Sequence, residues 1–334
     1  MTITNEKIPI IEIKNLSKLF VKKLDIVSKV VRSMGADIQE EKVQALDEVN
    51  LKIFKGEVVG LVGETGCGKS TLGRIVAGIL KPSEGSVSFY GQDLSTKKNK
   101  ELKKIMLKIQ MIFQDPFASL NPRMRVCDII GEAPRVHGLV SPRELDTYLD
   151  ELMQQCGLDP FYKPRYPHQL SGGQRQRIAI ARALAVKPEF IVCDEIVSAL
   201  DVSIQAQILN MFMDHRKKYG FTSLFISHDL GVVEHVSDRV AIMYLGRIFE
   251  QAKTEKLFAE PLHPYTKALL EEVPKISKRR INFVPIKGEI PSPINPPAGC
   301  HFHPRCPDTI TNCKHERPAL RKIDTDHFVA CHLF

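Results

Sequence analysis

The pattern of hydrophobic and polar residues divides the chain into a β-rich beginning, an α/β middle and a loop-rich end. Apolar and polar residues alternate over residues 8–20 and 45–54, which predicts two strands. Residues 21–43 between them are charged, and we expect an insertion of loop and short helix there. From Glu57 onward, short apolar runs alternate with helical patterns, which indicates a mostly parallel sheet.

The middle of the chain contains three apolar runs that suit buried strands, at residues 57–62, 190–194 and 222–227. A helical pattern over residues 69–80 follows the first run. Residues 115–186 are mostly helical in pattern and predict a helical subdomain.

The end of the chain has a different composition. Ten of the 21 prolines fall between Pro261 and Pro307, a density that no regular helix tolerates. We therefore predict one large unit over residues 8–260 and a small loop-rich appendage over residues 261–334, here called the tail.

The overall composition is that of an ordinary globular protein. Its 334 residues leave room for roughly two domains, and a hydrophobic content of 43% argues against wholesale disorder. Lys and Arg (47) exceed Asp and Glu (39), which suits phosphate ligands, nucleic acid or an anionic membrane surface. No run approaches the roughly 18 apolar residues of a membrane helix, and eight cysteines without a secretory signal predict a reducing compartment.

The strongest chemical motif follows the first buried strand. Residues 63–70 read GETGCGKS and fit G-x-x-x-x-G-K-[ST], in which backbone N–H groups and a helix N-terminus surround phosphate oxygens. Lys69 would supply positive charge to the β- and γ-phosphates, and Ser70 would offer its hydroxyl to Mg²⁺. An ordinary glycine-rich turn is the alternative, but the position between a predicted strand and a predicted helix favours a phosphate cradle.

Two adjacent carboxylates end the apolar run at residues 190–194. Asp194 and Glu195 would be commonplace alone, but beside a phosphate cradle they suit specific roles. Asp194 would hold Mg²⁺, and Glu195 would act as general base toward the attacking water. Because the carboxyl ends of parallel strands share one sheet edge, we expect both acids near the cradle.

A second glycine-rich turn, LSGGQ at residues 170–174, introduces a helix. Ser171, Gly172 and Gly173 leave free backbone N–H groups at the helix start, which makes a second anion-binding surface. One molecule is not expected to need two such surfaces for one γ-phosphate. We therefore predict a head-to-tail dimer in which this turn completes the partner subunit's nucleotide site.

In this order, the motifs resemble those of the ATP-binding subunits of ABC transporters over residues 10–255. The resemblance implies an α/β fold of the ABC-type P-loop ATPases, with a parallel-sheet core, an antiparallel β subdomain and a helical subdomain. It also implies that the chain binds ATP and Mg²⁺ and hydrolyses ATP. The residues implied to bind the nucleotide are Gly63, Glu64, Thr65, Gly66, Cys67, Gly68, Lys69, Ser70, Thr71, Ser171, Gly172, Gly173 and Gln174.

Further residues gain roles from the same resemblance. Gln114 would touch Mg²⁺ and sense the membrane partner, and His228 would contact the γ-phosphate. Asp201 would couple the two nucleotide sites across the dimer. Phe20 stands where the family stacks an aromatic ring on adenine, although a core phenylalanine fits the sequence nearly as well. Ile196 replaces the proline that usually follows the acid pair.

Several stretches narrow the resemblance to the ATPases of oligopeptide and dipeptide permeases, and among these to the second ATPase subunit. They are FQDPFASLNPRM, RYPHQLSGGQRQR, SALDVSIQAQ and PLHPYTKALL, together with the tail. The resemblance implies solute import from the cytoplasmic face of the membrane, where the chain would lie as a peripheral protein. Its implied partners are two integral-membrane permease subunits, a second related ATPase and, indirectly, an extracytoplasmic solute-binding protein. Nickel importers share much of the pattern, and a mixed or an identical dimer is compatible with it.

Four cysteines of the tail, Cys300, Cys306, Cys313 and Cys331, have the spacing C-x5-C-x6-C-x17-C. Zinc sites favour closer pairs, but four thiols in a segment too small for its own core suggest a metal staple. The resembling dipeptide ATPases carry a [4Fe–4S] cluster here, and four thiolates suit such a cluster. Zinc, with nearby histidines as further ligands, and free thiols are the alternatives.

Two other functions compete with this interpretation. A nucleic-acid ABC ATPase would separate the halves of its pocket with long coiled coils, but no heptad run lies between Lys69 and Leu170. We therefore expect no nucleic-acid partner. The other competitor is an iron–sulfur regulatory protein in which ATPase activity is secondary.

Overall fold

The computed structural model describes residues 8–21, 41–272 and 288–334. The predicted insertion lies mainly in residues 22–40, outside the described residues. Two sheets form the framework, and the smaller is antiparallel with the order β2-β1-β4-β5. Its strands are β1 (Ile11–Val21), β2 (Lys42–Ile53), β4 (Glu84–Phe89) and β5 (Gln92–Asp93). The two long strands confirm the predicted β-rich beginning.

The larger sheet has the order β11-β12-β10-β9-β3-β8-β7-β6 among the described residues. Its parallel centre consists of β3 (Val58–Val62), β6 (Ile109–Ile112), β7 (Phe190–Asp194), β8 (Thr222–Ser227) and β9 (Arg239–Tyr244). The antiparallel edge consists of β10 (Arg247–Lys253), β11 (Arg321–Asp324) and β12 (His327–Val329). Every residue of β3, β7 and β8 is buried, as expected for parallel strands covered on both faces.

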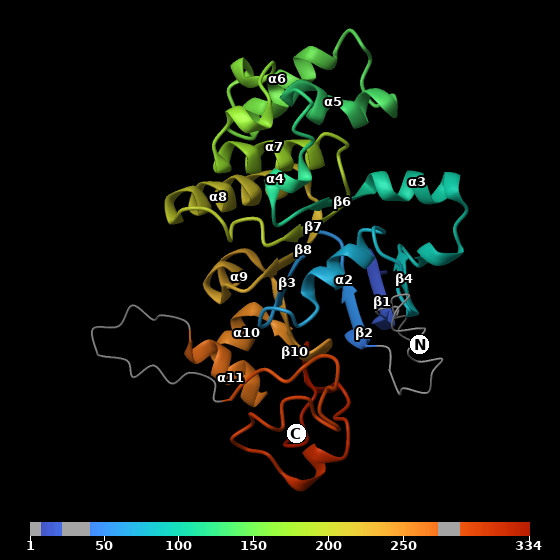
Figure 1. Ribbon diagram of the computed structural model, residues 1–334, viewed down its shortest axis with the longest axis vertical. Coiled ribbons are helices and arrows are strands. Elements are labelled where there is room, and N and C mark those ends of the chain that lie inside the picture. Colours follow the sequence, from blue (N-terminus) through green and yellow to red (C-terminus); the bar gives the residue numbers. More distant parts are fainter. Residues whose placement is uncertain (1–7, 22–40, 273–287) are drawn as a thin grey trace, which may run out of the picture.

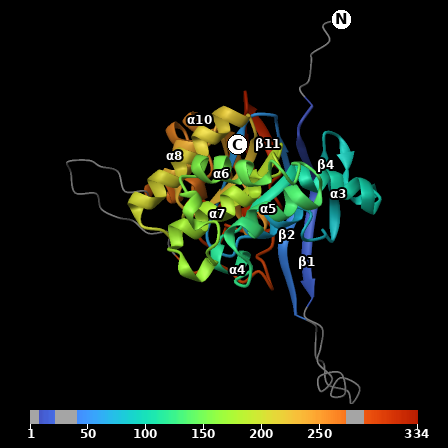
Figure 2. The same ribbon diagram turned by 90° about the horizontal axis from the view of Figure 1, so that it is seen from above.

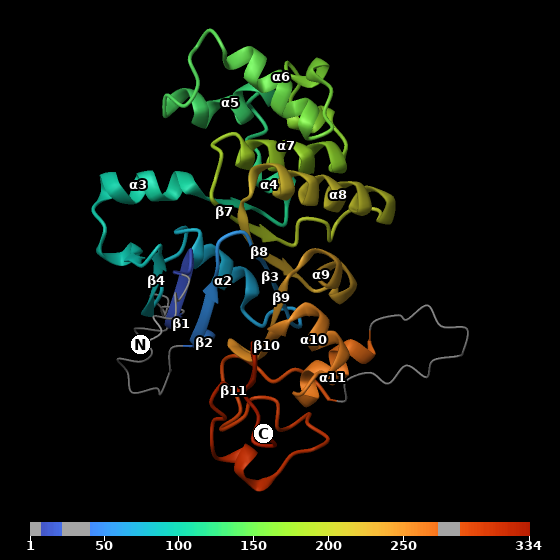
Figure 3. The same ribbon diagram turned by 180° about the vertical axis from the view of Figure 1, so that it is seen from behind.

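The helices cover the sheets and build a separate layer at one end of the molecule, opposite the tail (Figures 1 and 3). That layer contains α5 (Val126–Val136), α6 (Leu145–Gln155) and α7 (Gly172–Leu184), with α4 (Pro116–Ser119) at its base. The remaining helices are α2 (Lys69–Val76), α3 (Asn99–Lys108), α8 (Val202–Tyr219), α9 (Leu230–Val236), α10 (Thr254–Ala259) and α11 (Pro264–Glu271). None of the described helices is long and apolar enough to cross a membrane.

Helix α2 is shorter than the sequence pattern predicts. It ends at Val76 instead of continuing to residue 80. Gly78 has a φ of +70°, a left-handed conformation that ends the helix, and the N–H groups of Ile79 and Leu80 turn back to the carbonyl of Arg74. The apolar residues after Val76 therefore belong to a turn.

Successive side chains of a strand point to opposite faces of the larger sheet, so the apolar core has two layers. Val58 and Val62 of β3 pack with the helical layer, whereas Val59 and Leu61 pack on the opposite face. That opposite face is covered by α2 and by the antiparallel sheet, which lies to one side of α7 and α8 when the molecule is viewed from above (Figure 2). The larger sheet is therefore a rigid platform between two apolar layers.

The tail shares the core of the rest of the molecule. Strand β12 pairs with β10, which extends the larger sheet. Phe302 is fully buried in the same apolar cluster as Tyr244 and Tyr265. One stretch within the proline-rich region is helical, because Pro264 occupies the first turn of α11, where its missing N–H costs nothing.

Candidate functional site

One cavity of about 310 Å³ unites most of the predicted catalytic residues. Its walls come from β2, the phosphate cradle, the ends of β6, β7 and β8, and the tail. The lining residues are Val43, Ala45, Thr65, Gly66, Gly68, Lys69, Ser70, Thr71, Gln114, Glu195, His228 and Pro293. The structure thus brings Gln114, Glu195 and His228 to the cradle, as the sequence predicts.

The cradle requires glycine at the positions where the motif has it. A Cβ atom on Gly63 would lie 2.0 Å from the carbonyl oxygen of Met243. Gly68 has a φ of +106°, and its Cβ would lie 2.3 Å from the carbonyl oxygen of Ala45. Lys69 Nζ donates to the carbonyl of Gly63 at 2.6 Å and to that of Glu64 at 3.0 Å. The loop therefore curls tightly around the ammonium group, a geometry that suits phosphate oxygens.

The predicted magnesium ligands are in contact. Ser70 Oγ donates to Asp194 Oδ1 at 2.9 Å, and Asp194 is 1% exposed. Burial raises the pKa of Asp194, and the hydrogen bond from Ser70 opposes that rise. A hydroxyl and a carboxylate are hard oxygen donors, and Mg²⁺ at phosphate sites binds through one or two protein ligands. The pair therefore fits Mg²⁺ bound together with a nucleotide.

The second acid of the pair lies among polar partners. Glu195 Oε2 accepts a hydrogen bond from Gln114 Nε2 at 2.7 Å and lies 3.4 Å from His228 Nδ1. Glu195 has a φ of +47°, a left-handed conformation that is uncommon for residues other than glycine. Ile196, which stands in the place of the usual proline, is 2% exposed and belongs to the core. The tight turn after β7 therefore directs the Glu195 carboxylate into the cavity.

The remaining predicted residues lie elsewhere in the described part of the subunit. Ser171 caps α7, where it forms a capping box with Gln174, and Asp201 precedes α8. Neither these residues nor Phe20 lines the cavity. Phe20 is 41% exposed, so it is not a core phenylalanine. Its register partner on β2 is Val43, which does line the cavity.

Sequence reasoning missed three wall residues, Val43, Ala45 and Pro293. It also missed Arg305 and Tyr265, which bond to Glu64 of the cradle. No local signal identifies these residues, because each reaches the site through strand pairing or tail packing.

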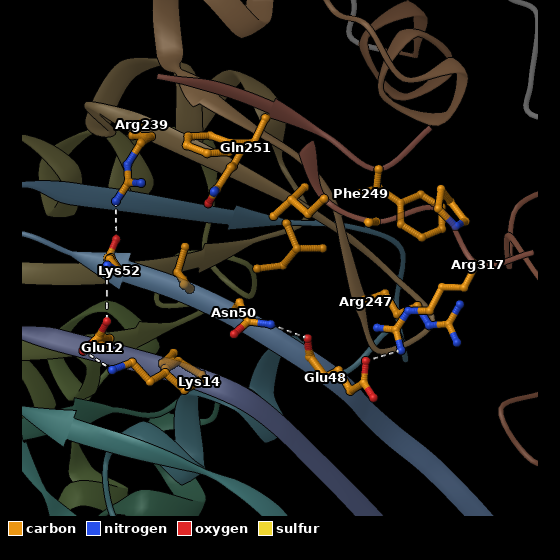
Figure 4. A pocket seen from close by; sticks show the side chains of 18 of the residues that line it. Glu12, Lys14, Glu48, Asn50, Lys52, Arg239, Arg247, Phe249, Gln251 and Arg317 are labelled. Carbon is orange, nitrogen blue, oxygen red and sulfur yellow. Dashed lines mark hydrogen bonds and ion pairs between the residues drawn. The ribbon is translucent and has the colours of Figure 1, made fainter. Parts of the chain in front are cut away.

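A larger cavity of about 780 Å³ lies apart from the cradle, between the antiparallel sheet and the tail (Figure 4). Several of its charged side chains are paired with one another. Lys14 and Lys52 flank Glu12 at 3.1 and 3.3 Å, and Arg317 of the tail lies 2.7 Å from Glu48. We assign the nucleotide to the smaller cavity, because the cradle and both acids meet there and the larger cavity contains no phosphate-binding loop.

The prediction of a metal centre in the tail is wrong. Among the described residues, no group of three or more His, Cys, Asp or Glu side chains is placed to hold a metal ion. This finding overturns the [4Fe–4S] cluster expected at Cys300, Cys306, Cys313 and Cys331, and also the alternative of a zinc ion there. Burial raises the pKa values of Cys300 and Cys306 to about 11. The premise of a segment without a core also fails, because Cys300, Phe302 and Cys313 belong to the main core.

Comparisons with known proteins agree with the cradle and the tail. A family model described as ABC transporter matches residues 46–198, and one described as oligopeptide/dipeptide transporter, C-terminal region, matches residues 249–313. The chain is similar to the "Dimeric Structure of MJ0796, a Bacterial ABC Transporter Cassette", with 30% identity and a TM-score of 0.62. That similarity covers 73% of this chain and 98% of the other.

Two relatives from Bacillus subtilis (strain 168) are similar over most of the chain. The "Oligopeptide transport ATP-binding protein AppF" is 47% identical over 338 residues, which cover 100% of both chains. The "Putative oligopeptide transport ATP-binding protein YkfD" is 50% identical over 301 residues, which cover 89% of this chain and 91% of the relative. The chain therefore belongs to the ATP-binding proteins of ABC transporters, in the oligopeptide branch.

Proposed function

We propose that this chain is the ATP-hydrolysing subunit of an ABC importer for oligopeptides. The observation that carries the proposal is the single cavity that Lys69, Ser70, Gln114, Glu195 and His228 line together. The cradle binds triphosphate, and Glu195 beside it activates water. The oligopeptide substrate follows from the relatives, whose names describe oligopeptide transport.

In the proposed mechanism, the cradle N–H groups and Lys69 hold the phosphates of ATP. Ser70, Asp194 and Gln114 would hold Mg²⁺, which supplies charge neutralisation at the β- and γ-phosphate oxygens. Glu195 accepts a proton from the water that attacks the γ-phosphorus, so that ADP and phosphate are the products.

The polar contacts of the acid support this assignment. The hydrogen bond from Gln114 orients the Glu195 carboxylate. His228 lies close to Glu195 on the same cavity wall, from which it would contact the γ-phosphate.

The proposed working unit is a dimer in which each nucleotide lies between two subunits. The turn from Ser171 to Gln174 binds the γ-phosphate held by the partner subunit, and Asp201 couples the two sites. The partner is a second, related ATPase. Residues 8–260 form the ATP-binding unit, and residues 261–334 form a tail of the oligopeptide-transporter type. The dimer drives two membrane-embedded permease subunits from the cytoplasmic face, and a solute-binding protein delivers the peptide.

The test is reconstitution of the complete transporter in liposomes, with uptake of labelled di- to pentapeptides as the readout. We expect uptake that requires MgATP enclosed in the liposomes and the solute-binding protein outside them, and that stops in Glu195→Gln transporters. Uptake of Ni²⁺ instead of peptides would replace the substrate assignment. ATPase activity that responds to DNA but not to the permease subunits would reject the transport function.

A further inference from the structure

The tail contacts the phosphate cradle at Glu64, whose side chain has no role in the proposed mechanism. Arg305 donates two hydrogen bonds to the Glu64 carboxylate, from Nη1 to Oε2 at 2.8 Å and from Nη2 to Oε1 at 3.0 Å. The Arg305 side chain is 5% exposed and that of Glu64 is 20% exposed. A bidentate pair of this kind fixes orientation as well as distance. The tail is therefore joined rigidly to the second residue of the cradle.

The backbone of Glu64 is held by two further elements. Its N–H group donates to the hydroxyl of Tyr265, on α11, at 3.0 Å. Its carbonyl accepts from Lys69 Nζ at 3.0 Å and from the N–H group of Cys67 at 3.2 Å. The ammonium group that the mechanism assigns to the phosphates thus rests on a carbonyl whose orientation depends on Arg305 and Tyr265.

Arg305 is itself anchored in an aromatic cluster. Its N–H group donates to the carbonyl of Phe302 at 2.9 Å, and its Nη1 donates to the hydroxyl of Tyr244 at 3.2 Å. The ring of Phe302 lies 5.4 Å from that of Tyr244 and 5.2 Å from that of Tyr265 between centroids. Burial lowers the pKa of Arg305, but the bonds to Glu64 and Tyr244 more than offset this, so the net pKa is raised. The guanidinium therefore stays charged at the cradle.

We infer that Arg305 is a positioning residue for the nucleotide site, through which the tail holds the phosphate cradle in its ATP-binding shape. The pair connects positions 241 residues apart in the sequence. Pro293 of the tail also lines the cavity, so the tail meets the site at two places. The inference rests on the proposed function, because it requires that the cradle binds ATP.

The test compares four single variants and one double variant by isothermal titration calorimetry with ATP, because the chain has no tryptophan to report binding. Arg305→Gln and Glu64→Gln each remove one side of the pair, and the double variant removes both. Arg317→Gln is the matched control, since it breaks another pair between tail and body, with Asp47 and Glu48 on β2. Thermal midpoints without nucleotide are measured for all of them.

We expect Arg305→Gln and Glu64→Gln each to weaken ATP binding about 5- to 20-fold, within the range of typical coupling between sites. The double variant should bind no more weakly than the worse single variant, because both changes remove the same interaction. Arg305→Lys keeps the positive charge but loses the bidentate geometry of the guanidinium. Its ATP affinity should therefore lie between those of wild type and Arg305→Gln.

Wild-type affinity in Arg305→Gln, or equal losses in Arg305→Gln and Arg317→Gln, would overturn the inference. Additive losses in the double variant would also overturn it. These outcomes differ from failure of the proposed function, in which the wild-type chain itself would bind no ATP.

Discussion

Replacing Glu195 by glutamine tests the assignment of the general base. The carboxylate accepts a hydrogen bond from Gln114 Nε2 at 2.7 Å, lies 3.4 Å from His228 and is 12% exposed. Glutamine has the same length, and its amide oxygen can still accept the bond from Gln114. The exchange therefore removes the charge and the proton-accepting capacity while it keeps the shape of the cavity.

The expected loss is the contribution of a positioned general base. Such a base accelerates a reaction by about 10²- to 10⁴-fold, which corresponds to about 2.7–5.4 kcal/mol of activation free energy. ATP affinity should change little, because the proposed phosphate contacts come from the cradle and Lys69 and not from Glu195. Thermal stability should also change little, because glutamine and glutamate have similar backbone preferences at the left-handed position.

The assay is steady-state phosphate release by the reconstituted transporter, with ATP affinity measured in parallel. Gln114→Ala is the companion variant, because it removes the hydrogen-bond donor but leaves the base in place. We expect a smaller loss of turnover in that variant than in Glu195→Gln. Turnover of Glu195→Gln within about threefold of wild type would refute the assignment, since even the weakest general-base effect exceeds that factor.

Three further predictions follow from the geometry. Lys69→Ala should weaken ATP binding about 10- to 100-fold, the value of a charge-assisted contact, and unchanged affinity in calorimetry would contradict the cradle assignment. Gly63→Ala should destabilise the fold by about 2–4 kcal/mol, because its Cβ would meet the Met243 carbonyl oxygen at 2.0 Å. Gly172→Ala should not, because its Cβ would lie 3.9 Å from the Leu200 side chain, an ordinary contact distance. Denaturant titration distinguishes the two variants. Burial lowers the pKa of His263 to about 3. The free energy of unfolding should therefore be highest above about pH 6.5 and decrease below it, by about 2 kcal/mol at pH 5. His263→Asn, which can keep the cap on α11, should make the free energy of unfolding less dependent on pH.

The motifs that could be predicted from sequence are those whose chemistry is contiguous in the chain. The GETGCGKS loop contains its own glycines and its lysine, and the structure places both as the motif requires. Strands β7 and β8 begin and end where their apolar runs do. The meeting of Ser70 with Asp194 was also predictable, because parallel strands present their carboxyl ends at one edge.

The features that could not be predicted depend on contacts between distant segments. The tail was expected to need a metal because its own length cannot supply a core. In the structure the tail packs into the core of the larger unit, through Phe302 and through the pairing of β12 with β10. Four cysteines at wide spacing carry no information about whether their side chains converge, since packing of the intervening residues decides that. The composition of the tail therefore gave a wrong prediction, because tertiary packing decides whether the tail has a core and whether its cysteines form a metal site.

The chain has two anion-binding turns, the phosphate cradle and the start of α7, and their positions indicate how the nucleotide site is completed. The cradle forms a walled cavity with Glu195 and His228, whereas the start of α7 lies outside that cavity. The Ser171 hydroxyl accepts a hydrogen bond from the N–H group of Gln174. The N–H groups of the first helical residues therefore remain available for another acceptor. A helix N-terminus of this kind favours an anion, and the γ-phosphate of a nucleotide bound to a second subunit meets that requirement. The separation of the two turns within one subunit thus favours a site completed by dimerisation over one that works alone.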